Sequence, residues 1–321
     1  MKLRLLVLLG LTLASFSSAT WGFFAHQRIN RLAVFSLPPE MIGFYKHHIR
    51  FITEKAVNPD MRRYAIPEEA PRHYIDLDVY GDSAVHKLPR YWFDAVEMYT
   101  EDTLQAYGIV PWHVNRVKDW LTDAFKKQDK DQILRLSADL GHYIADANVP
   151  LHTTENYNGQ FTGQYGIHGF WESRLPELFA ENYSLFVGKA EYIPNTQLRI
   201  WDAVTKANMA LDSVFLFEKE ITATRGSSTK FVIEQRGNSN LRTYSQEFSK
   251  AYHDKLSGMV ERRMKASIKM IADFWYTAWV DGGQPDLNKL IDQKSQEEEE
   301  KLAKDKDIKL RNHESGEVVE N

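Results

Sequence analysis

The chain has 321 residues, with 40 basic and 44 acidic side chains, a formal net charge of -4 and no cysteine. That charge argues against a broad electrostatic grip on duplex nucleic acid, which needs a basic surface. The lack of cysteine excludes a disulfide framework and lipid attachment to a cysteine. The length suits one sizeable domain.

The first twenty residues have the pattern of a secretory signal peptide. Lys2 and Arg4 precede the apolar run 5–13, and small residues follow over 17–20. The apolar run is too short to span a bilayer, and no comparable run follows it, so we expect no transmembrane segment. We therefore predict a signal peptide over 1–20 and export to the periplasm or the extracellular space.

The next segments present scattered candidate ligands. Apolar residues over 29–36 follow a helical period that ends at Pro38, and His26 lies near the start of that helix. The loop-rich segment that follows carries Asp60 and His73. Each of these side chains, taken alone, is as easily explained by an ordinary structural or surface role.

The apolar pattern of residues 91–125 predicts helix with a break at Gly108 and Pro111. A further helix is predicted to begin at Asp131, and it carries the first pair of candidate metal ligands. His142 and Asp146 are four residues apart on this helix, on one face and turned away from its apolar stripe. The alternative is a solvated polar face with an ordinary His and Asp. The apolar stripe consists of Ile133, Leu136, Leu140, Ile144 and Ala147.

A second pair follows closely. His152 lies just beyond Pro150, which should end the helix, and His168 and Glu172 are again four apart. Each pair can aim two ligands at one point. Three imidazoles and two carboxylates brought together in this way form the ligand set that zinc prefers.

The pattern of the residues after Glu172 predicts further helices. Residues 192–237 read as short helical pieces with a polar loop, and 256–280 read as a long helix closed by Gly282 and Gly283. Residues 291–321 are charged and poor in large apolar side chains, so we expect a disordered tail there. The fold class predicted is all-α, with a single, mostly helical domain over 21–290 that is monomeric and has no implied protein partner.

Taken together, these motifs resemble the superfamily of zinc-dependent phospholipases C and secreted single-strand-specific zinc nucleases. The resemblance rests on Trp21-Gly22, His26, Asp60, His73, His142-x3-Asp146-x5-His152 and His168-x3-Glu172. It implies a helical domain with three zinc ions in a cleft. The implied ligands are Asp60, His73, His142 and Asp146 for one ion, His152, His168 and Glu172 for a second, and His26, Asp146 and the amine and carbonyl of Trp21 for the third.

The resemblance also implies a chemistry. A water bridging two zinc ions would attack phosphorus in line, and Asp60 could accept its proton. The amine of Trp21 can bind metal only after cleavage behind Thr20. Cleavage after Ala19 would leave Thr20 first and remove that ligand, so we expect cleavage after Thr20.

The substrate is less defined by sequence. Glu172 as the last ligand and the short gap from His152 to His168 are more like the phospholipases, whereas Tyr74 and Trp171 are more like the nucleases. Other aromatic side chains could line the substrate rim, or could simply pack; they are Tyr157, Phe161 and Tyr165.

We therefore expect a phospholipase-C-like phosphodiester hydrolase acting on phospholipid. A single-strand nuclease or 3'-nucleotidase acting on single-stranded nucleic acid or nucleotides is the alternative. A zinc-stabilised binding protein without turnover is the alternative from another class.

Overall fold

The computed structural model describes residues 22–236, 239–291 and 293. The predicted signal peptide, Trp21 and almost all of the predicted tail lie outside these residues. Within them the fold is all-α, as predicted, with one small hairpin. None of the helices in this part of the chain is long and apolar enough to cross a membrane.

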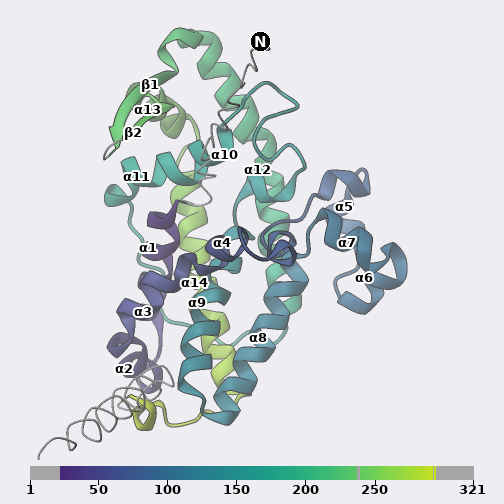
Figure 1. The fold of residues 1–321 in the computed structure, drawn as a ribbon, viewed down its shortest axis with the longest axis vertical. Helices are drawn as coiled ribbons and strands as arrows, with labels where there is room; N and C mark the ends of the chain where they lie inside the picture. The colour runs from purple at the N-terminus through teal and green to yellow at the C-terminus, as the bar shows by residue number, and fades with distance from the viewer. Residues whose placement is uncertain (1–21, 237–238, 292, 294–321) are drawn as a thin grey trace, which may run out of the picture.

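Four long helices form the body of the molecule, and shorter helices pack around them (Figure 1). Helix α9 packs against α8, α14 and α1, which places it at the centre of the bundle. The helices are α1 (Phe23–Ala33), α2 (Pro39–His47), α3 (Ile49–Glu54), α4 (Asn58–Arg62), α5 (Ala84–Lys87), α6 (Trp92–Tyr99), α7 (Glu101–Tyr107), α8 (Val110–Lys127), α9 (Lys130–Asp146), α10 (Ile167–Gly169), α11 (Leu175–Phe179), α12 (Thr196–Arg225), α13 (Gln246–Lys255) and α14 (Met259–Asp281). Short 3-10 helices cover Val34–Ser36, Lys55–Val57, Pro67–His73, Leu77–Tyr80, Pro150–Thr153, Ala180–Asn182, Ser227–Thr229 and Leu287–Leu290, and Phe170–Arg174 is a π-helix.

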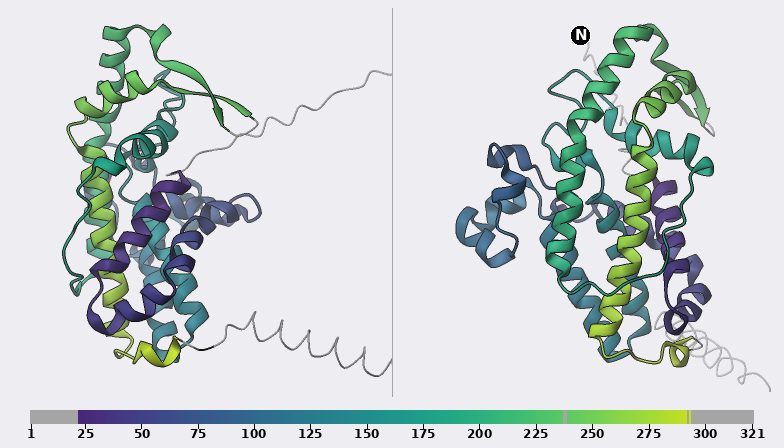
Figure 2. Two further views of the ribbon diagram at one scale, coloured as in Figure 1. Left: turned by 90° about the vertical axis from the view of Figure 1, so that its left-hand side faces the viewer. Right: turned by 180° about the vertical axis from the view of Figure 1, so that it is seen from behind.

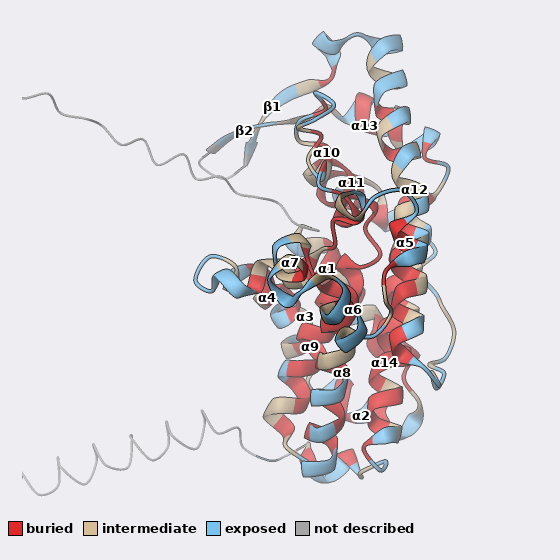
Figure 3. Cartoon of the chain, turned by 90° about the vertical axis from the view of Figure 1, so that its right-hand side faces the viewer, coloured by how far each residue is buried: buried red, intermediate tan, exposed pale blue. Residues whose placement is uncertain are grey.

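The position of α9 depends on a close approach to α1. A Cβ atom added at Gly141 would lie 2.1 Å from Oδ1 of Asn30, so only glycine fits there. The Nδ2 of Asn30 donates a hydrogen bond of 3.0 Å to the carbonyl of Ala138, which joins the two helices. This contact brings His26 of α1 against His142 of α9, with ring centroids 3.9 Å apart. The second half of α9 is buried on every face (Figure 3).

The region 192–237 differs from the prediction of short helical pieces. It contains one helix of 30 residues, α12, followed by the start of a hairpin. Helix α12 packs against the 3-10 helix Pro150–Thr153, α8 and α13. Its apolar side chains therefore serve several neighbours and do not form the single stripe by which a long amphipathic helix is recognised.

The hairpin consists of β1 (Phe231–Arg236) and β2 (Ser239–Tyr244), antiparallel, with Phe231 opposite Tyr244 and Glu234 opposite Leu241. It projects from one end of the bundle to the same side as the α4 region, with the start of α1 between them (Figure 2). Alternation over six residues per strand is a weak signal, which explains why the sequence did not reveal it.

The predicted break at Gly108 and Pro111 is present. Helix α7 ends at Tyr107, Gly108 follows with a φ of 92°, and α8 begins at Val110 with Pro111 in its first turn, where its missing N–H costs nothing. A second break, which was not predicted, lies at Thr100 and separates α6 from α7 with a φ of 66°.

Candidate metal centre

The structure brings eight of the predicted ligands into three neighbouring groups. In each group one nitrogen or oxygen per residue lies within 4.8 Å of the others. The groups are His26 with His142 and Asp146, then Asp60 with His73 and His142, then His152 with His168 and Glu172. The ninth predicted ligand, Trp21, lies outside the described residues.

Seven separate elements supply these side chains. Helix α1 carries His26, α4 carries Asp60, and the 3-10 helix Pro67–His73 ends on His73. Helix α9 carries His142 and Asp146 in its last turns, as predicted. The 3-10 helix Pro150–Thr153 carries His152, α10 carries His168, and the π-helix carries Glu172.

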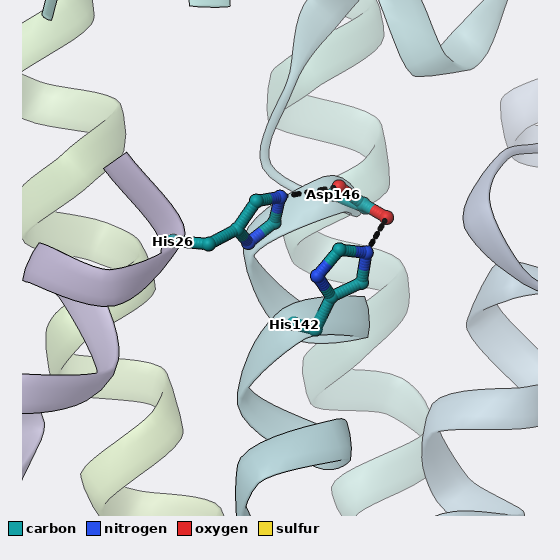
Figure 4. A group of neighbouring side chains, drawn as sticks. All are labelled: His26, His142 and Asp146. Carbon is teal, nitrogen blue, oxygen red and sulfur yellow. Dashed lines mark ion pairs between the residues drawn. The ribbon is translucent and has the colours of Figure 1, made fainter. Parts of the chain in front are cut away.

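Asp146 lies between the first two groups. Its Oδ2 is 2.8 Å from Nδ1 of His73 and 3.2 Å from Nε2 of His142. Its Oδ1 is 3.4 Å from Nε2 of His26 (Figure 4). All four side chains are buried, so this carboxylate faces three imidazoles away from solvent.

Backbone carbonyls fix the orientation of two imidazoles. Nδ1 of His142 donates to the carbonyl of Ala56 at 2.8 Å, and Nδ1 of His152 donates to the carbonyl of His73 at 2.6 Å. A carbonyl can only accept, so Nδ1 carries the proton and Nε2 of the neutral ring holds a lone pair. Hydrogen bonding of the second ring nitrogen is the usual outer arrangement of metal-binding histidines.

The lone pairs point at carboxylates. Nε2 of His152 lies 3.2 Å from Oε2 of Glu172, just as Nε2 of His142 faces Asp146. Two acceptors at this distance need a cation or a proton between them. The donor set of these groups therefore fits a bound divalent cation.

His168 and Glu172 keep their predicted spacing in an unexpected conformation. They do not share a regular α-helix, because α10 ends at Gly169 and a π-helix continues from Phe170. Nε2 of His168 still lies 3.0 Å from Oε1 of Glu172. The carboxylate is thus approached by one imidazole at each oxygen, and single π-turns are frequent at functional sites.

Burial keeps the ligands in the forms that bind cations. It lowers the pKa of His26 to about 4, where His142 acts in the same direction, and lowers that of His168 to about 4. Despite burial, the imidazoles of His142 and His152 hold the pKa of Asp146 well below its usual range. Near neutral pH the imidazoles of His26 and His168 are therefore neutral and the carboxylate of Asp146 is ionised, as metal binding requires.

Two groups hold protons in the metal-free protein. Burial raises the pKa of Glu172 to about 8. Although burial opposes it, the carboxylates of Asp146 and Asp60 raise the pKa of His142 to about 9. Protons occupy the positions that a cation would take, so cation binding would release them.

A buried carboxylate behind the site was not found from sequence. Oε1 of Glu69 lies 3.7 Å from Nε2 of His73, on the side of the ring away from Asp146. Glu69 also accepts hydrogen bonds from Arg72 at 2.6 Å, from Arg62 at 3.3 Å and from the hydroxyl of Tyr143. Its spacing of four residues from His73 was the available signal.

A cavity of about 390 Å³ opens beside the metal-ligand groups. It is lined by His73, His152 and His168, and by three of the four predicted substrate-contact residues, Tyr74, Tyr157 and Phe161. Arg63, Asp76, Glu155 and Gln160 also line it. Burial, Asp78 and Glu155 raise the pKa of Asp76 to about 7. The fourth predicted contact, Tyr165, lines a different cavity on the other side of the segment that carries His168.

No protein-family model and no curated protein matches the chain. Among solved structures the chain is similar to the alpha toxin from Clostridium absonum, with a TM-score of 0.48 and 12% sequence identity. The match covers 84% of this chain and 65% of the toxin chain, so this chain spans less than two thirds of that protein. Similarity of this degree establishes neither a shared family nor a shared activity.

Proposed function

We propose that the chain is a zinc-dependent phosphodiester hydrolase with phospholipase-C-like activity. The observation that carries the proposal is the set of buried imidazole lone pairs directed at carboxylates, next to an open cavity. Neutral imidazoles and carboxylates, without thiolates, suit zinc. Bound zinc would supply an acidified water as nucleophile and positive charge for the departing oxygen.

Three ions are proposed, held as the sequence resemblance implies. One would be held by Asp60, His73, His142 and Asp146, a second by His152, His168 and Glu172, and a third by His26, Asp146 and Trp21. The close approach of Asp146 to His26, His73 and His142 supports a bridging role for this carboxylate. Gly22 supports the placement of Trp21, because it packs beside Ser173, the residue after Glu172.

Asp60 is proposed to accept the proton of the attacking water. Its Oδ1 lies 3.6 Å from Nε2 of His142 and 3.8 Å from Nδ1 of His73, at the edge of the ligand groups. Although burial opposes it, His142 and His26 hold the pKa of Asp60 below its usual value, so the group is ionised and ready to accept. Arg63 lies 3.7 Å from Asp60 and lines the cavity, where its guanidinium can bind a phosphate oxygen.

The nuclease activity remains the second candidate because of one observation. Tyr74, Tyr157 and Phe161 bring three aromatic rings to the cavity beside His152, and aromatic rings stack on bases of single strands. We further propose that residues 1–20 direct export, that 21–290 form the catalytic domain, and that 291–321 form a charged tail. The domain is proposed to act as a monomer.

The test uses the chain from Trp21 onward, loaded with zinc. It is assayed on phosphatidylcholine vesicles and on single-stranded DNA, each with and without a chelator. Chelator-sensitive release of diacylglycerol would support the proposal, and chelator-sensitive release of nucleotides would support the second candidate. Zinc binding without either activity would favour a zinc-stabilised binding protein.

A further inference from the structure

A second and larger cavity, of about 640 Å³, lies on the other side of the segment that carries the ligands His168 and Glu172. Gly169 and Ser173 line it, whereas His168 lines the smaller cavity. The two cavities are therefore lined by neighbouring residues of one segment, and the larger one adjoins the residues next to His168 and Glu172. The side chains that give the larger cavity its character are Phe23, Tyr64, Tyr165, Phe170, Leu241 and Tyr244.

The hairpin β1–β2 forms one wall of this cavity and is tied to the ligand-bearing segment. Arg174, two residues after Glu172, donates to both carboxylate oxygens of Glu234 on β1, at 3.0 Å for Nη1 and closer for Nη2. Its Nε donates to the carbonyl of Tyr244 on β2 at 3.2 Å. An isolated two-stranded hairpin is marginally stable, so these contacts hold the wall in place.

Aromatic stacking completes the attachment. The ring of Tyr244 lies against that of Phe170, with centroids 3.6 Å apart and planes at 5°. At the base of the hairpin, buried Lys230 pairs with buried Glu218. Glu218 also accepts a hydrogen bond from Gln164, which lies in the loop 154–166 before α10. The wall, the loop and the π-helix thus form one connected unit.

The two cavities differ in chemistry. The smaller one presents Asp76, Glu155 and Arg63 beside the histidines. In the larger one, the buried guanidinium of Arg174 is paired with Glu234, and the guanidinium of Arg242 lies over the ring of Phe231. Glu177 is the other charged lining residue, and aromatic rings with Leu241 make up most of the rest. A substrate that reaches from the smaller cavity across this segment would therefore pass from a site beside the histidines to one dominated by aromatic rings.

We propose that the hairpin-walled cavity binds the apolar alcohol portion of a phosphodiester, with Leu241 and Tyr64 contributing from opposite walls. The inference rests on the proposed hydrolase function and names the part of the substrate that this cavity takes. Tyr64 is 71% exposed and Leu241 39% exposed, so each has apolar surface left to cover.

The test measures binding directly, so it does not depend on turnover. Dihexanoylglycerol, a short soluble diacylglycerol, is titrated into the zinc-loaded chain from Trp21 by calorimetry. Leu241→Asn and Tyr64→Ala should each weaken binding about tenfold, as expected for losing one apolar contact. The matched control is Ile233→Asn, on the same hairpin, 70% exposed and outside the cavity lining, which should change binding less than about twofold.

Circular dichroism and zinc content verify that each variant is folded and loaded. Failure of dihexanoylglycerol to bind, or equal weakening by Leu241→Asn and Ile233→Asn, would overturn the proposed apolar site even if vesicles are hydrolysed. Binding that depends on Leu241, without vesicle hydrolysis, would support the apolar site and overturn only the phospholipase proposal. Displacement of the diacylglycerol by a dinucleotide would assign the cavity to nucleic acid and overturn the inference.

Discussion

The substitution Asp146→Asn tests whether the buried carboxylate binds metal, and α9 supplies a matched control. Asp139 lies two turns earlier on the same helix, is 4% exposed, and accepts from Arg62 at 3.0 Å and 3.3 Å. Both changes, Asp146→Asn and Asp139→Asn, replace a buried carboxylate by an amide of the same shape. Only Asp146 belongs to a metal-ligand group.

The expected magnitude follows from mass action. A cation that binds only the folded state stabilises it by about 2.7 kcal/mol per site at a free concentration of one hundred times Kd. For a domain of this size each kcal/mol shifts Tm by about 2–4 °C, so one site should contribute roughly 5–10 °C. Because Asp146 lies within 3.4 Å of His26, His73 and His142, its loss should remove the contribution of two of the three proposed ions.

The assay is thermal unfolding of the metal-free chain with and without added zinc. Asp139→Asn should lower the Tm of the metal-free protein, because it breaks the pair with Arg62, yet keep the full zinc-dependent rise. Asp146→Asn should keep only the rise due to His152, His168 and Glu172. Equal zinc-dependent rises in the two variants would refute the metal-binding role of Asp146.

Three further outcomes are expected. Gly141→Ala should destabilise the fold by roughly 1–3 kcal/mol in chemical denaturation, because the new Cβ meets Asn30 at 2.1 Å, whereas Gly43→Ala on α2, with its nearest atom at 3.6 Å, should be neutral or stabilising. In the metal-free protein the folded state keeps a proton on Glu172 that the unfolded state releases above the ordinary pKa of 4.5. The contribution of Glu172 to the free energy of unfolding should therefore fall as pH rises from 4.5 through its folded pKa of about 8. Denaturation at pH 6 and 9 checks this, since Glu172→Gln and zinc loading should each flatten the dependence, and an unchanged slope in both would contradict the cause given. Glu69→Gln should lower zinc affinity about ten- to a hundredfold in competition with a chromophoric chelator, because Glu69 lies beside the outer nitrogen of His73, a proposed zinc ligand. Unchanged affinity would contradict this role of Glu69.

The ligand pairs at 142/146 and 168/172 came from spacing, whereas His26, Asp60 and His73 became candidates only through the family resemblance. Spacing carries only part of the geometry. The pair His142 and Asp146 could be placed on one helical face because a helix fixes the directions of residues four apart. The side chains of His168 and Glu172 approach each other as predicted, although the backbone from Phe170 onward is a π-helix and not the α-helix on which the prediction was based. The partners of His26, in contrast, depend on how α1 packs on α9, which no local pattern encodes.

The features missed from sequence share one physical cause, which is that they arise from contacts between distant segments. Glu69 gains its role only when Arg62 and Tyr143 fold around it. The length of α12 was missed because the helix packs against several neighbours, so its apolar side chains do not form a single stripe. The hairpin is short, and its stability depends on Arg174 and Phe170, which lie more than fifty residues before it.

The energetics of the site connect its chemistry to the stability of a chain without disulfides. Asp60, Asp146 and Glu172 are almost fully buried, and taking a carboxylate out of water costs several kcal/mol unless a partner offsets it. In the metal-free protein a protonated His142 offsets part of this cost for Asp146 and Asp60, and Glu172 avoids it by keeping a proton. A divalent cation would offset the cost for all three carboxylates and would join α1, α4, α9 and the π-helix. Metal binding would then cross-link segments spanning residues 26 to 172, as disulfides do in many exported proteins. The same burial that makes the metal-free site costly would thus make zinc a condition of stability as well as of the proposed activity.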